Sequence, residues 1–237
     1  SAKRITVVVP FYPYARQDKK HLGREPISAR LIADMYKTAG ANRLMSVDLH
    51  AAQIQGFFDG PVDHLWALPV LADYLVGKYE TAEMTVVSPD SGRVRVADMW
   101  SDRLGCRLAI IHKRRDPDLP NQVVMHEVVG DVQGRVCLLV DDMIDTAGTI
   151  CQAAEALQDR GAKAVIAAAT HPVLSGPAGD RLKATGFEEV IVTNTLPIAE
   201  HQHFDALTVL SIAPLIARAI REVFEDGSVT SLFNGQG

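Results

Sequence analysis

Short aliphatic runs alternate along the chain with segments in which apolar residues recur every three or four positions. The runs are typical of buried strands and the periodic segments of amphipathic helices. We expect strands at residues 5–9, 43–49, 84–88, 108–111, 136–140, 165–170, 190–193 and 207–210, with a small edge strand at 228–233. We expect helices at residues 28–39, 68–79, 97–104, 151–160, 181–185 and 212–224. This alternation predicts an α/β fold with doubly wound parallel sheets.

A change in the pattern near residue 60 suggests two domains. Gly60 and Pro61 interrupt the alternation just before Asp63 and His64. With 237 residues, the chain is long enough to form two modest hydrophobic cores. We predict a first domain of residues 1–63 together with 219–237, and a second domain of residues 64–218.

Composition narrows the class of protein without identifying it. Hydrophobic residues make up 47% and charged residues 22%, which is ordinary for a globular protein, and the net charge of −5 argues against a nucleic-acid partner. The three cysteines are scattered and one of them, Cys137, falls in a predicted buried strand, so we expect no disulfide framework and a reducing, cytoplasmic location. No apolar run of membrane-spanning length and no signal peptide is visible, so we expect no membrane partner.

The run at residues 136–140 leads into the segment with the clearest chemistry. Three carboxylates and four small residues follow it: Asp141, Asp142, Asp145, Thr146, Ala147, Gly148 and Thr149. A strand, a small-residue loop and a helix start form a phosphate site in α/β folds, because backbone N–H groups at a helix N-terminus point at the anion and small residues let it approach. The threonine hydroxyls can add donors.

The acidic pair in this segment needs a separate explanation, since carboxylates repel phosphate. A ligand with sugar hydroxyls beside its phosphate explains both features, because Asp141 and Asp142 can accept hydrogen bonds from the hydroxyls or hold Mg²⁺. Ribose 5-phosphate matches both halves of the loop. The alternative is an acidic helix cap, but a cap accounts for one aspartate and not for three.

Other polar residues follow predicted strands at the edge where open α/β sheets bind ligands. Arg16 and Gln17 lie in a loop with two lysines after the first strand, His50 follows the second and Asp90 follows the strand at 84–88. The loop could bind a polyphosphate, but a solvated basic loop is an equal alternative. A lone histidine is more often structural than a ligand.

Three consecutive cations at residues 113–115 precede Asp116-Pro117 and suggest a loop. A charge run is usually a solvated surface. Phosphoryl-type transfer, however, depends on stabilising dispersed negative charge, and a mobile cationic loop serves that chemistry.

The segment D-D-M-I-D-T-A-G-T-I resembles the phosphoribosyl-diphosphate binding motif of phosphoribosyltransferases and ribose-phosphate diphosphokinases. Four further segments, A-R-Q-D-K-K, D-L-H-A-A-Q-I-Q-G-F-F, V-S-P-D and K-R-R, are similar to the diphosphokinases alone. That resemblance implies two phosphoribosyltransferase-like domains, the first incomplete, and transfer of the diphosphoryl group of ATP to the 1-hydroxyl of ribose 5-phosphate. It also implies a homo-oligomer built from dimers, a hexamer in the family.

The resemblance assigns roles to individual residues. It implies that Arg16 and Gln17 bind ATP, that His50 and Asp90 hold the Mg²⁺ of Mg–ATP, and that Lys113 and Arg115 stabilise the transition state. It places ribose 5-phosphate at Asp141, Asp142, Asp145, Thr146, Ala147, Gly148 and Thr149.

Two departures from the family pattern stand out. Arg93 occupies a position where a second glycine is often found, and the first strands and an acidic loop of the family have no counterpart before Ile5. We therefore expect an exposed sheet edge before Ile5 and weakened ATP binding.

Two other functions remain possible from the sequence. A phosphoribosyltransferase would share the segment at 141–149 but would leave the Arg16 loop, His50 and Lys113 unexplained. A non-catalytic relative that binds diphosphokinase subunits would be expected to have lost Lys113 or Arg115, and both are present.

Overall fold

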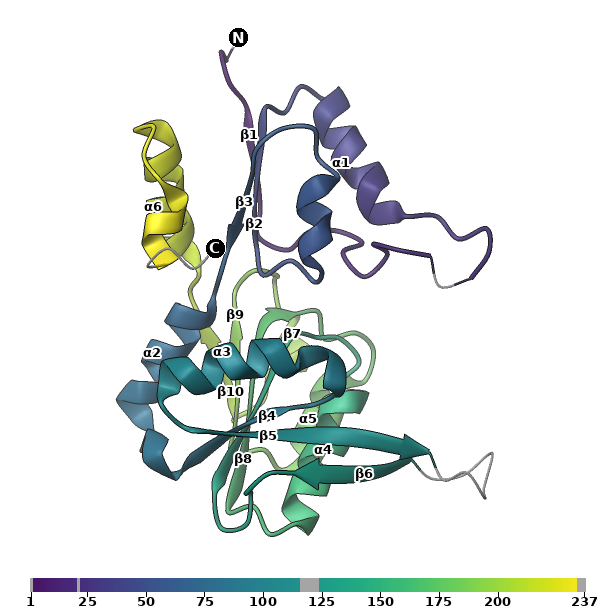
Figure 1. Ribbon diagram of the computed structural model, residues 1–237, viewed down its shortest axis with the longest axis vertical. Helices are drawn as coiled ribbons and strands as arrows, with labels where there is room; N and C mark the ends of the chain where they lie inside the picture. The colour runs from purple at the N-terminus through teal and green to yellow at the C-terminus, as the bar shows by residue number, and fades with distance from the viewer. Residues whose placement is uncertain (1, 21, 116–123, 234–237) are drawn as a thin grey trace. The chain divides into compact units, whose positions relative to one another are not determined.

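The chain folds into two compact units (Figure 1). The computed structural model describes residues 2–20, 22–115 and 124–233, and for residues 113–115 and 124–126 it describes the backbone. Unit 1 comprises Ser1–Ala67 and Ile212–Gly237, and unit 2 comprises Leu68–Ser211. The boundaries predicted from the sequence fall inside a strand and inside a helix, whereas the units meet between such elements.

Unit 1 is built on a parallel sheet of three strands in the order β1-β2-β3. Its elements are β1 (Thr6–Val9), α1 (Ser28–Thr38), β2 (Arg43–Val47), the 3-10 helix η1 (Ala52–Gly56), β3 (Val62–Leu65), α6 (Ala213–Phe224) and the 3-10 helix η5 (Val229–Phe233). Leu44, Ile54 and Tyr12 are fully buried and form its core with Ala29 and Ala33 of α1. Removing such side chains from water is the main stabilising contribution to the unit.

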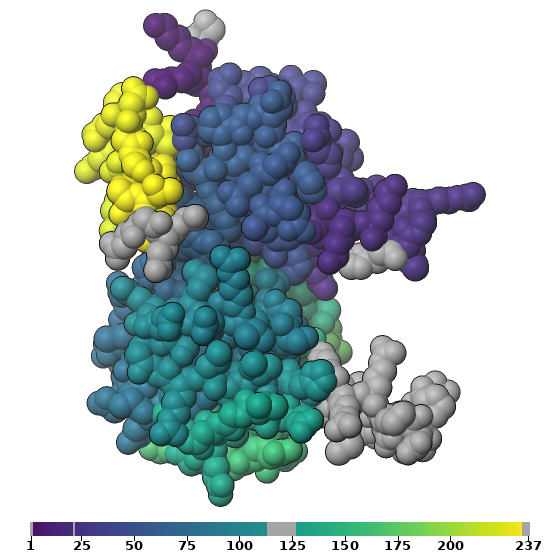
Figure 2. Space-filling model, viewed as in Figure 1, coloured from purple at the N-terminus to yellow at the C-terminus, as the bar shows by residue number. Residues whose placement is uncertain are grey.

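The two ends of the described chain belong to the same unit. The helix α6 lies beside the sheet of unit 1 in the space-filling view, where its yellow atoms border the purple and blue ones (Figure 2). Arg4 and Asp226 form an exposed ion pair of 3.4 Å between the two segments. Strand β1 pairs with β2 on one side and with no other described strand, and Ile5 just before it is 43% exposed.

Unit 2 contains a sheet of seven strands in the order β10-β9-β8-β7-β4-β5-β6. Its strands are β4 (Met84–Ser88), β5 (Arg107–Arg115), β6 (Val124–Val129), β7 (Val136–Ile144), β8 (Ala164–Pro172), β9 (Glu189–Thr193) and β10 (Leu207–Leu210). Its helices are α2 (Leu68–Lys78), α3 (Val94–Leu104), α4 (Gly148–Asp159) and α5 (Ala178–Thr185), with the 3-10 helices η2 (Thr81–Glu83), η3 (Ser91–Arg93) and η4 (Glu200–Gln202).

Strands of unit 2 are parallel apart from β6, which is antiparallel to β5. Helices α2 and α3 pack together, as do α4 and α5, and the two pairs cover opposite faces of the sheet (Figure 1). Because β7 is covered on both faces, Cys137, Leu138, Leu139 and Val140 have no exposed surface. The predicted doubly wound α/β fold is confirmed.

Two local predictions were wrong, and two strands were not predicted. The cations at 113–115 lie in β5 and not in a loop, because antiparallel pairing with β6 extends that strand and places Lys113 opposite His126. Strands β6 and β3 were not predicted from the sequence. Residues 229–233 form η5 and not an edge strand, since the Ser231 amide and hydroxyl both donate to the Ser228 carbonyl oxygen and close a tight turn.

In the part of the chain that is described, no helix combines the length and hydrophobicity needed to cross a membrane. All three cysteines are free; Cys137 and Cys151 are buried and Cys106 is half-buried. This matches the expectation that the chain has no disulfide framework.

Candidate active site

The candidate site of unit 2 lies where the strand order of the sheet reverses. From β4 the chain proceeds to β5 and β6 on one side, and from β7 it proceeds to β8, β9 and β10 on the other. Strands β4 and β7 are parallel neighbours, with Val87 opposite Leu139. Ligands of open α/β sheets bind at this point, beyond the carboxyl ends of the two strands, because the connections diverge there and leave a crevice.

The acidic pair lies on the part of β7 that extends past the end of β4. Asp141 pairs with Ala169 of β8, whereas β4 ends at Ser88 and the chain turns away there. Asp141 and Asp142 therefore lie beside the connection from β4 to α3. The strand was predicted to end before the aspartates, but β7 continues to Ile144.

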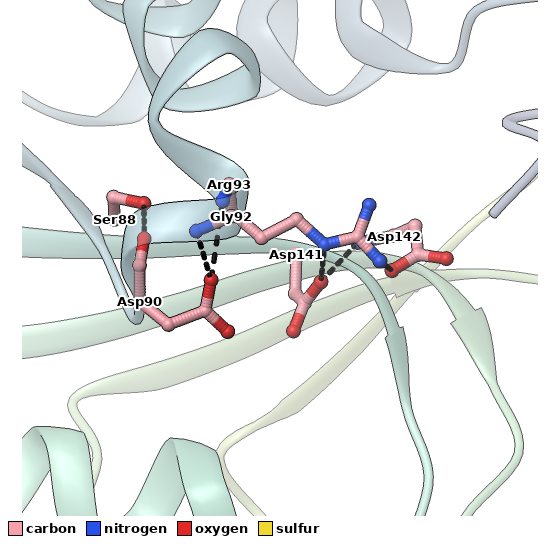
Figure 3. Close-up of polar contacts among 6 residues, drawn as sticks. All are labelled: Ser88, Asp90, Gly92, Arg93, Asp141 and Asp142. Carbon is pink, nitrogen blue, oxygen red and sulfur yellow. Dashed lines mark hydrogen bonds and ion pairs between the residues drawn. The ribbon is translucent and has the colours of Figure 1, made fainter. Parts of the chain in front are cut away.

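Arg93 reaches across from that connection and contacts both carboxylates (Figure 3). Its Nε lies 3.2 Å from Asp141 Oδ1, and one terminal nitrogen lies 2.5 Å from Asp142 Oδ1. The Asp142 amide also donates to Asp141 Oδ1 at 2.8 Å. One guanidinium thus joins two neighbouring carboxylates, and all three side chains are largely shielded from solvent.

Burial of the Asp141 carboxyl and its closeness to Asp142 raise the pKa of Asp141 above its ordinary value. The positive charge of Arg93 opposes this shift. A carboxylate pair whose ionisation depends on a neighbouring cation is typical of a binding site and not of a solvated surface.

The segment after β7 forms the tight loop that the sequence predicted. Ala147 has φ 62° and ψ 0°, in the left-handed region that non-glycine residues seldom adopt, and α4 begins at Gly148. Such a conformation costs about 1–2 kcal/mol and is retained mainly where function requires it. The loop exposes Thr146 and Thr149, while Ala147 is buried. The first amides of α4 therefore lie between two exposed threonines, Thr146 before the helix and Thr149 in its first turn.

Two contacts from other segments hold this loop in place. Arg181 of α5 donates to the Thr146 carbonyl oxygen at 2.9 Å, and the Ser175 amide donates to the Asp145 carbonyl oxygen at 3.0 Å. The Arg181 guanidinium also lies beside Gly148, 3.8 Å from where a side chain there would begin. Arg181 adds positive charge next to the helix N-terminus.

Asp90 caps η3 through one carboxylate oxygen. Its Oδ1 accepts from the amides of Gly92 at 2.8 Å and Arg93 at 3.1 Å, and its carbonyl oxygen accepts from the Ser88 hydroxyl at 2.6 Å (Figure 3). The cap fixes the start of the connection that carries Arg93. A carboxylate has a second oxygen, so a cap does not exclude metal binding.

In unit 1, Arg16 and Gln17 are exposed on the loop after β1. A buried frame supports them: the Tyr12 hydroxyl donates to the Ala29 carbonyl oxygen at 2.8 Å, and the buried carboxylate of Asp18 accepts from the side chain of Gln53. The side chains of Arg16 and Gln17 are therefore carried by a backbone that buried contacts hold in place, as a binding loop requires.

His50 follows β2 in unit 1 and is half-buried. The preceding residues are tied to β3 and its extension: the Leu49 amide donates to His64 Nε2 at 2.9 Å, and Asp48 Oδ2 accepts from the Ala67 amide at 3.1 Å. His64, which the sequence suggested only as part of a domain junction, thus fixes the segment that carries His50.

The structure brings together Asp90, the acidic pair and the loop at 145–149, all in unit 2. Arg16, Gln17 and His50 belong to unit 1 and are described within it. Lys113 and Arg115 lie on β5, and their side chains are outside the described part. From the sequence, the Arg93 side chain could alter the local backbone or contact a phosphate, and its contact with the acidic pair was not predicted. The roles of Arg181 and His64 were missed, because their contacts join residues far apart along the chain.

Among the described residues, no group of three or more His, Cys, Asp or Glu side chains is placed to hold a metal ion. Mg²⁺ does not require such a group, since it commonly binds one or two carboxylates together with substrate phosphates and water. The oxygen of a capping aspartate such as Asp90 fits that pattern.

Known proteins resemble the chain along its whole length. Residues 1–40 match the N-terminal domain of ribose phosphate pyrophosphokinase, and residues 117–234 match the phosphoribosyl synthetase-associated domain. The ribose-phosphate pyrophosphokinase of Streptomyces coelicolor is 70% identical over 236 residues, covering 100% of this chain and 73% of that protein. The enzyme of the same name from Mycobacterium tuberculosis is 66% identical, covering 99% and 72%. The crystal structure of phosphoribosylpyrophosphate synthetase from Mycobacterium smegmatis superposes with a TM-score of 0.89 at 63% identity, covering 96% of this chain and 74% of that one.

Proposed function

The chain belongs to the ribose-phosphate pyrophosphokinase family, and on that premise we propose which of its residues carry the family's reaction. In this reaction the 1-hydroxyl oxygen of ribose 5-phosphate attacks the β-phosphorus of ATP. The bond between the α,β-bridging oxygen and that phosphorus breaks, AMP leaves, and phosphoribosyl diphosphate forms. The hydroxyl proton is lost to solvent or to a base.

Asp141 and Asp142 are proposed to bind the ribose hydroxyls. The observation that carries this role is their position on β7 at the reversal of strand order, held together by Arg93. Carboxylates accept hydrogen bonds from hydroxyls strongly when a neighbouring cation keeps them ionised. A sugar fixed in this way can present its 1-hydroxyl in one orientation, which is a large part of catalysis by positioning.

The loop from Asp145 to Thr149 is proposed to bind the 5-phosphate. The amides at the start of α4 carry partial positive charge, and the hydroxyls of Thr146 and Thr149 are exposed next to them. Ala147 and Gly148 add little bulk, so a phosphate oxygen can approach the backbone. Arg181 supports the loop through the Thr146 carbonyl oxygen.

Arg16 and Gln17 are proposed to contact the nucleotide, and His50 and Asp90 are each proposed as a ligand of Mg²⁺. When bound, Mg²⁺ would offset charge on the triphosphate and so favour departure of AMP. An aspartate oxygen is the type of donor that Mg²⁺ prefers, whereas an imidazole nitrogen is a less usual ligand for this ion.

Lys113 and Arg115 are proposed to stabilise negative charge that develops on the transferred phosphoryl oxygens. Both lie on β5, whose partner β6 forms the edge of the sheet in unit 2. Losing such a cation typically lowers kcat by about 10²–10³-fold.

The decisive experiment is AMP formation from ATP, with ribose 5-phosphate and Mg²⁺ present or omitted one at a time. We expect AMP only when all three are present, whereas a phosphoribosyltransferase would release no AMP from ATP. Lys113→Ala should lower kcat, and Asp142→Asn should raise the KM for ribose 5-phosphate. Lys163→Ala is the matched control, because Lys163 forms only an exposed ion pair with Glu83. Unchanged turnover in Lys113→Ala would contradict the role of that residue.

Two further proposals come from the family. We propose that the chain assembles into a homo-oligomer based on dimers, which light scattering after size-exclusion chromatography tests. A cytoplasmic location is proposed from the free cysteines and the substrates.

A further inference from the structure

Arg93 lies at the junction of η3 and α3, and its backbone is held in place. Its amide donates to Asp90 Oδ1 at 3.1 Å, and its φ of −104° and ψ of 6° are accessible to any residue. The fixed backbone aims the side chain at the end of β7 (Figure 3). A substitution at this position can therefore change the guanidinium while leaving the course of the chain unaltered.

The guanidinium distributes its contacts between two acidic residues. It meets Asp141 through Nε at 3.2 Å and Asp142 through a terminal nitrogen at 2.5 Å, and in both cases the acceptor is Oδ1. A guanidinium that pairs with one carboxylate normally donates two parallel hydrogen bonds to the two oxygens of that carboxylate. Here it acts as a bridge, as a divalent cation between two carboxylates would.

The negative charge of the two carboxylates explains why a cation is needed between Asp141 and Asp142. When both are ionised, two adjacent aspartates carry a charge of −2 in a largely buried setting, and the ligand of the proposed function is itself an anionic sugar phosphate. With Arg93 in the bridge, the three side chains then carry −1 together. Each carboxylate has a second oxygen and several acceptor directions, so ribose hydroxyls can be accepted while the bridge stays in place.

We propose that Arg93 is a positioning residue that takes the place of a divalent cation between Asp141 and Asp142, so that this pair binds the ribose hydroxyls directly. The inference rests on the proposed function and goes beyond it: it separates the sugar site from the Mg²⁺ that accompanies ATP. Sugar binding to the unliganded protein then requires no metal.

Calorimetric binding of ribose 5-phosphate to the full chain without ATP, in EDTA and then in Mg²⁺, tests this. The wild-type Kd should change less than about twofold between the two conditions, because the bridge is already cationic. Arg93→Gly should weaken binding about tenfold or more in EDTA, and Mg²⁺ should restore most of the loss by entering the space left by the side chain. Arg93→Met, which keeps the bulk without the charge, should be weakened and not restored.

Arg103→Met is the matched control. Arg103 belongs to the same helix α3 and forms an exposed ion pair with Asp73, so its removal takes away one charge without touching the acidic pair. It should bind ribose 5-phosphate as the wild type does in both conditions. Thermal unfolding of each variant confirms that it is folded.

Equal binding by Arg93→Gly and the wild type in EDTA would overturn the inference, as would a wild type that loses affinity about tenfold when Mg²⁺ is removed. If the wild type does not bind ribose 5-phosphate without ATP, AMP formation still decides on the proposed function, and Mn²⁺ binding decides on the role of Arg93. Electron paramagnetic resonance should then detect an additional Mn²⁺ in Arg93→Gly that is absent from the wild type and from the double variant Arg93→Gly/Asp142→Asn. No additional Mn²⁺ would refute the role of Arg93 as a cation substitute.

Discussion

Glu189, the first residue of β9, has a buried carboxylate at the end of the sheet of unit 2 opposite to the candidate site. It accepts hydrogen bonds from Tyr74 at 2.6 Å, Tyr79 at 2.7 Å and Thr208 at 2.5 Å, and forms an ion pair with Lys78 at 3.0 Å. These partners come from α2, from the residue after it and from β10. A single charge thus connects three segments.

Glu189→Gln keeps the shape of the side chain and removes the charge. A hydrogen bond to a charged group contributes about 1.5–3 kcal/mol and a neutral one about 0.5–1.5, so neutralising the acceptor of three hydroxyls loses roughly 3 kcal/mol. The amide is easier to bury than a carboxylate, which offsets part of this loss. The ion pair with Lys78 contributes little to this loss, because the Lys78 side chain is half exposed and its charge is screened by solvent. The expected decrease in the free energy of unfolding is about 2 kcal/mol.

The effect should depend on pH in a defined direction. Burial of Glu189 opposes ionisation, but hydrogen bonds from Thr208, Tyr74 and Tyr79 outweigh it and lower the pKa of Glu189. A carboxyl group whose pKa is lower in the folded state stabilises the protein above its unfolded pKa, near 4.3 for glutamate, and loses that contribution as the pH falls through the folded value. The difference between wild type and variant should be full at neutral pH and shrink below about pH 4.

Differential scanning calorimetry measures the loss, which corresponds to a fall in Tm of about 4–8 °C for a chain of this size. Hydrogen exchange should accelerate most at the amides of β9 and β10. Glu188→Gln is the matched control, since Glu188 is exposed and adjacent. A Tm of Glu189→Gln within a degree or so of the control at neutral pH would refute the reasoning, because no difference of that size is compatible with three charge-assisted bonds.

Three further substitutions test one strained backbone position and two hydrogen bonds. Ala147→Gly should raise the free energy of unfolding by up to about 1 kcal/mol in urea titrations, because glycine adopts positive φ without strain, and an unchanged or lower value would contradict a strained loop. Arg181→Met should raise the KM for ribose 5-phosphate several-fold with little change in kcat; a fall in kcat alone would mean that Arg181 does not act through the loop. Tyr12→Phe should lower stability by about 1 kcal/mol through loss of the hydrogen bond to the Ala29 carbonyl oxygen. Since burial raises the pKa of Tyr12 to about 12, that loss should be constant from neutral pH to about pH 10, and a pH-dependent loss would contradict the buried position.

The fold could be predicted from the sequence where local pattern and long-range pairing agree. Strand β4 and the first five residues of β7 are short runs rich in apolar residues, and helix α1 has an apolar face, so their positions were predicted to within a few residues. Strand β6 was missed because its residues become a strand only by pairing with β5, which the local sequence does not report. The same pairing turned the cationic segment of β5 from a predicted loop into a strand.

Within the candidate site, the sequence indicated the residue types and the structure supplied the partners. Asp141, Asp142 and the small-residue loop are contiguous, so their chemistry could be inferred from order alone. The bridge from Arg93 spans 49 positions to Asp142, and no periodicity predicts such a contact. It depends on where β4 ends relative to β7, which is a property of register.

Unit 1 is formed by one segment that precedes unit 2 in the sequence and one that follows it, and this order constrains how the protein folds during synthesis. During synthesis the residues of β1, β2 and β3 leave the ribosome first, yet α6 follows only after the whole of Leu68–Ser211 has been translated. Unit 2 can therefore complete its core while unit 1 still lacks its last helix. A released chain that stops at residue 211 should be resistant to protease at residues 68–211 and sensitive before residue 68, so the part that is synthesised earlier completes its fold later.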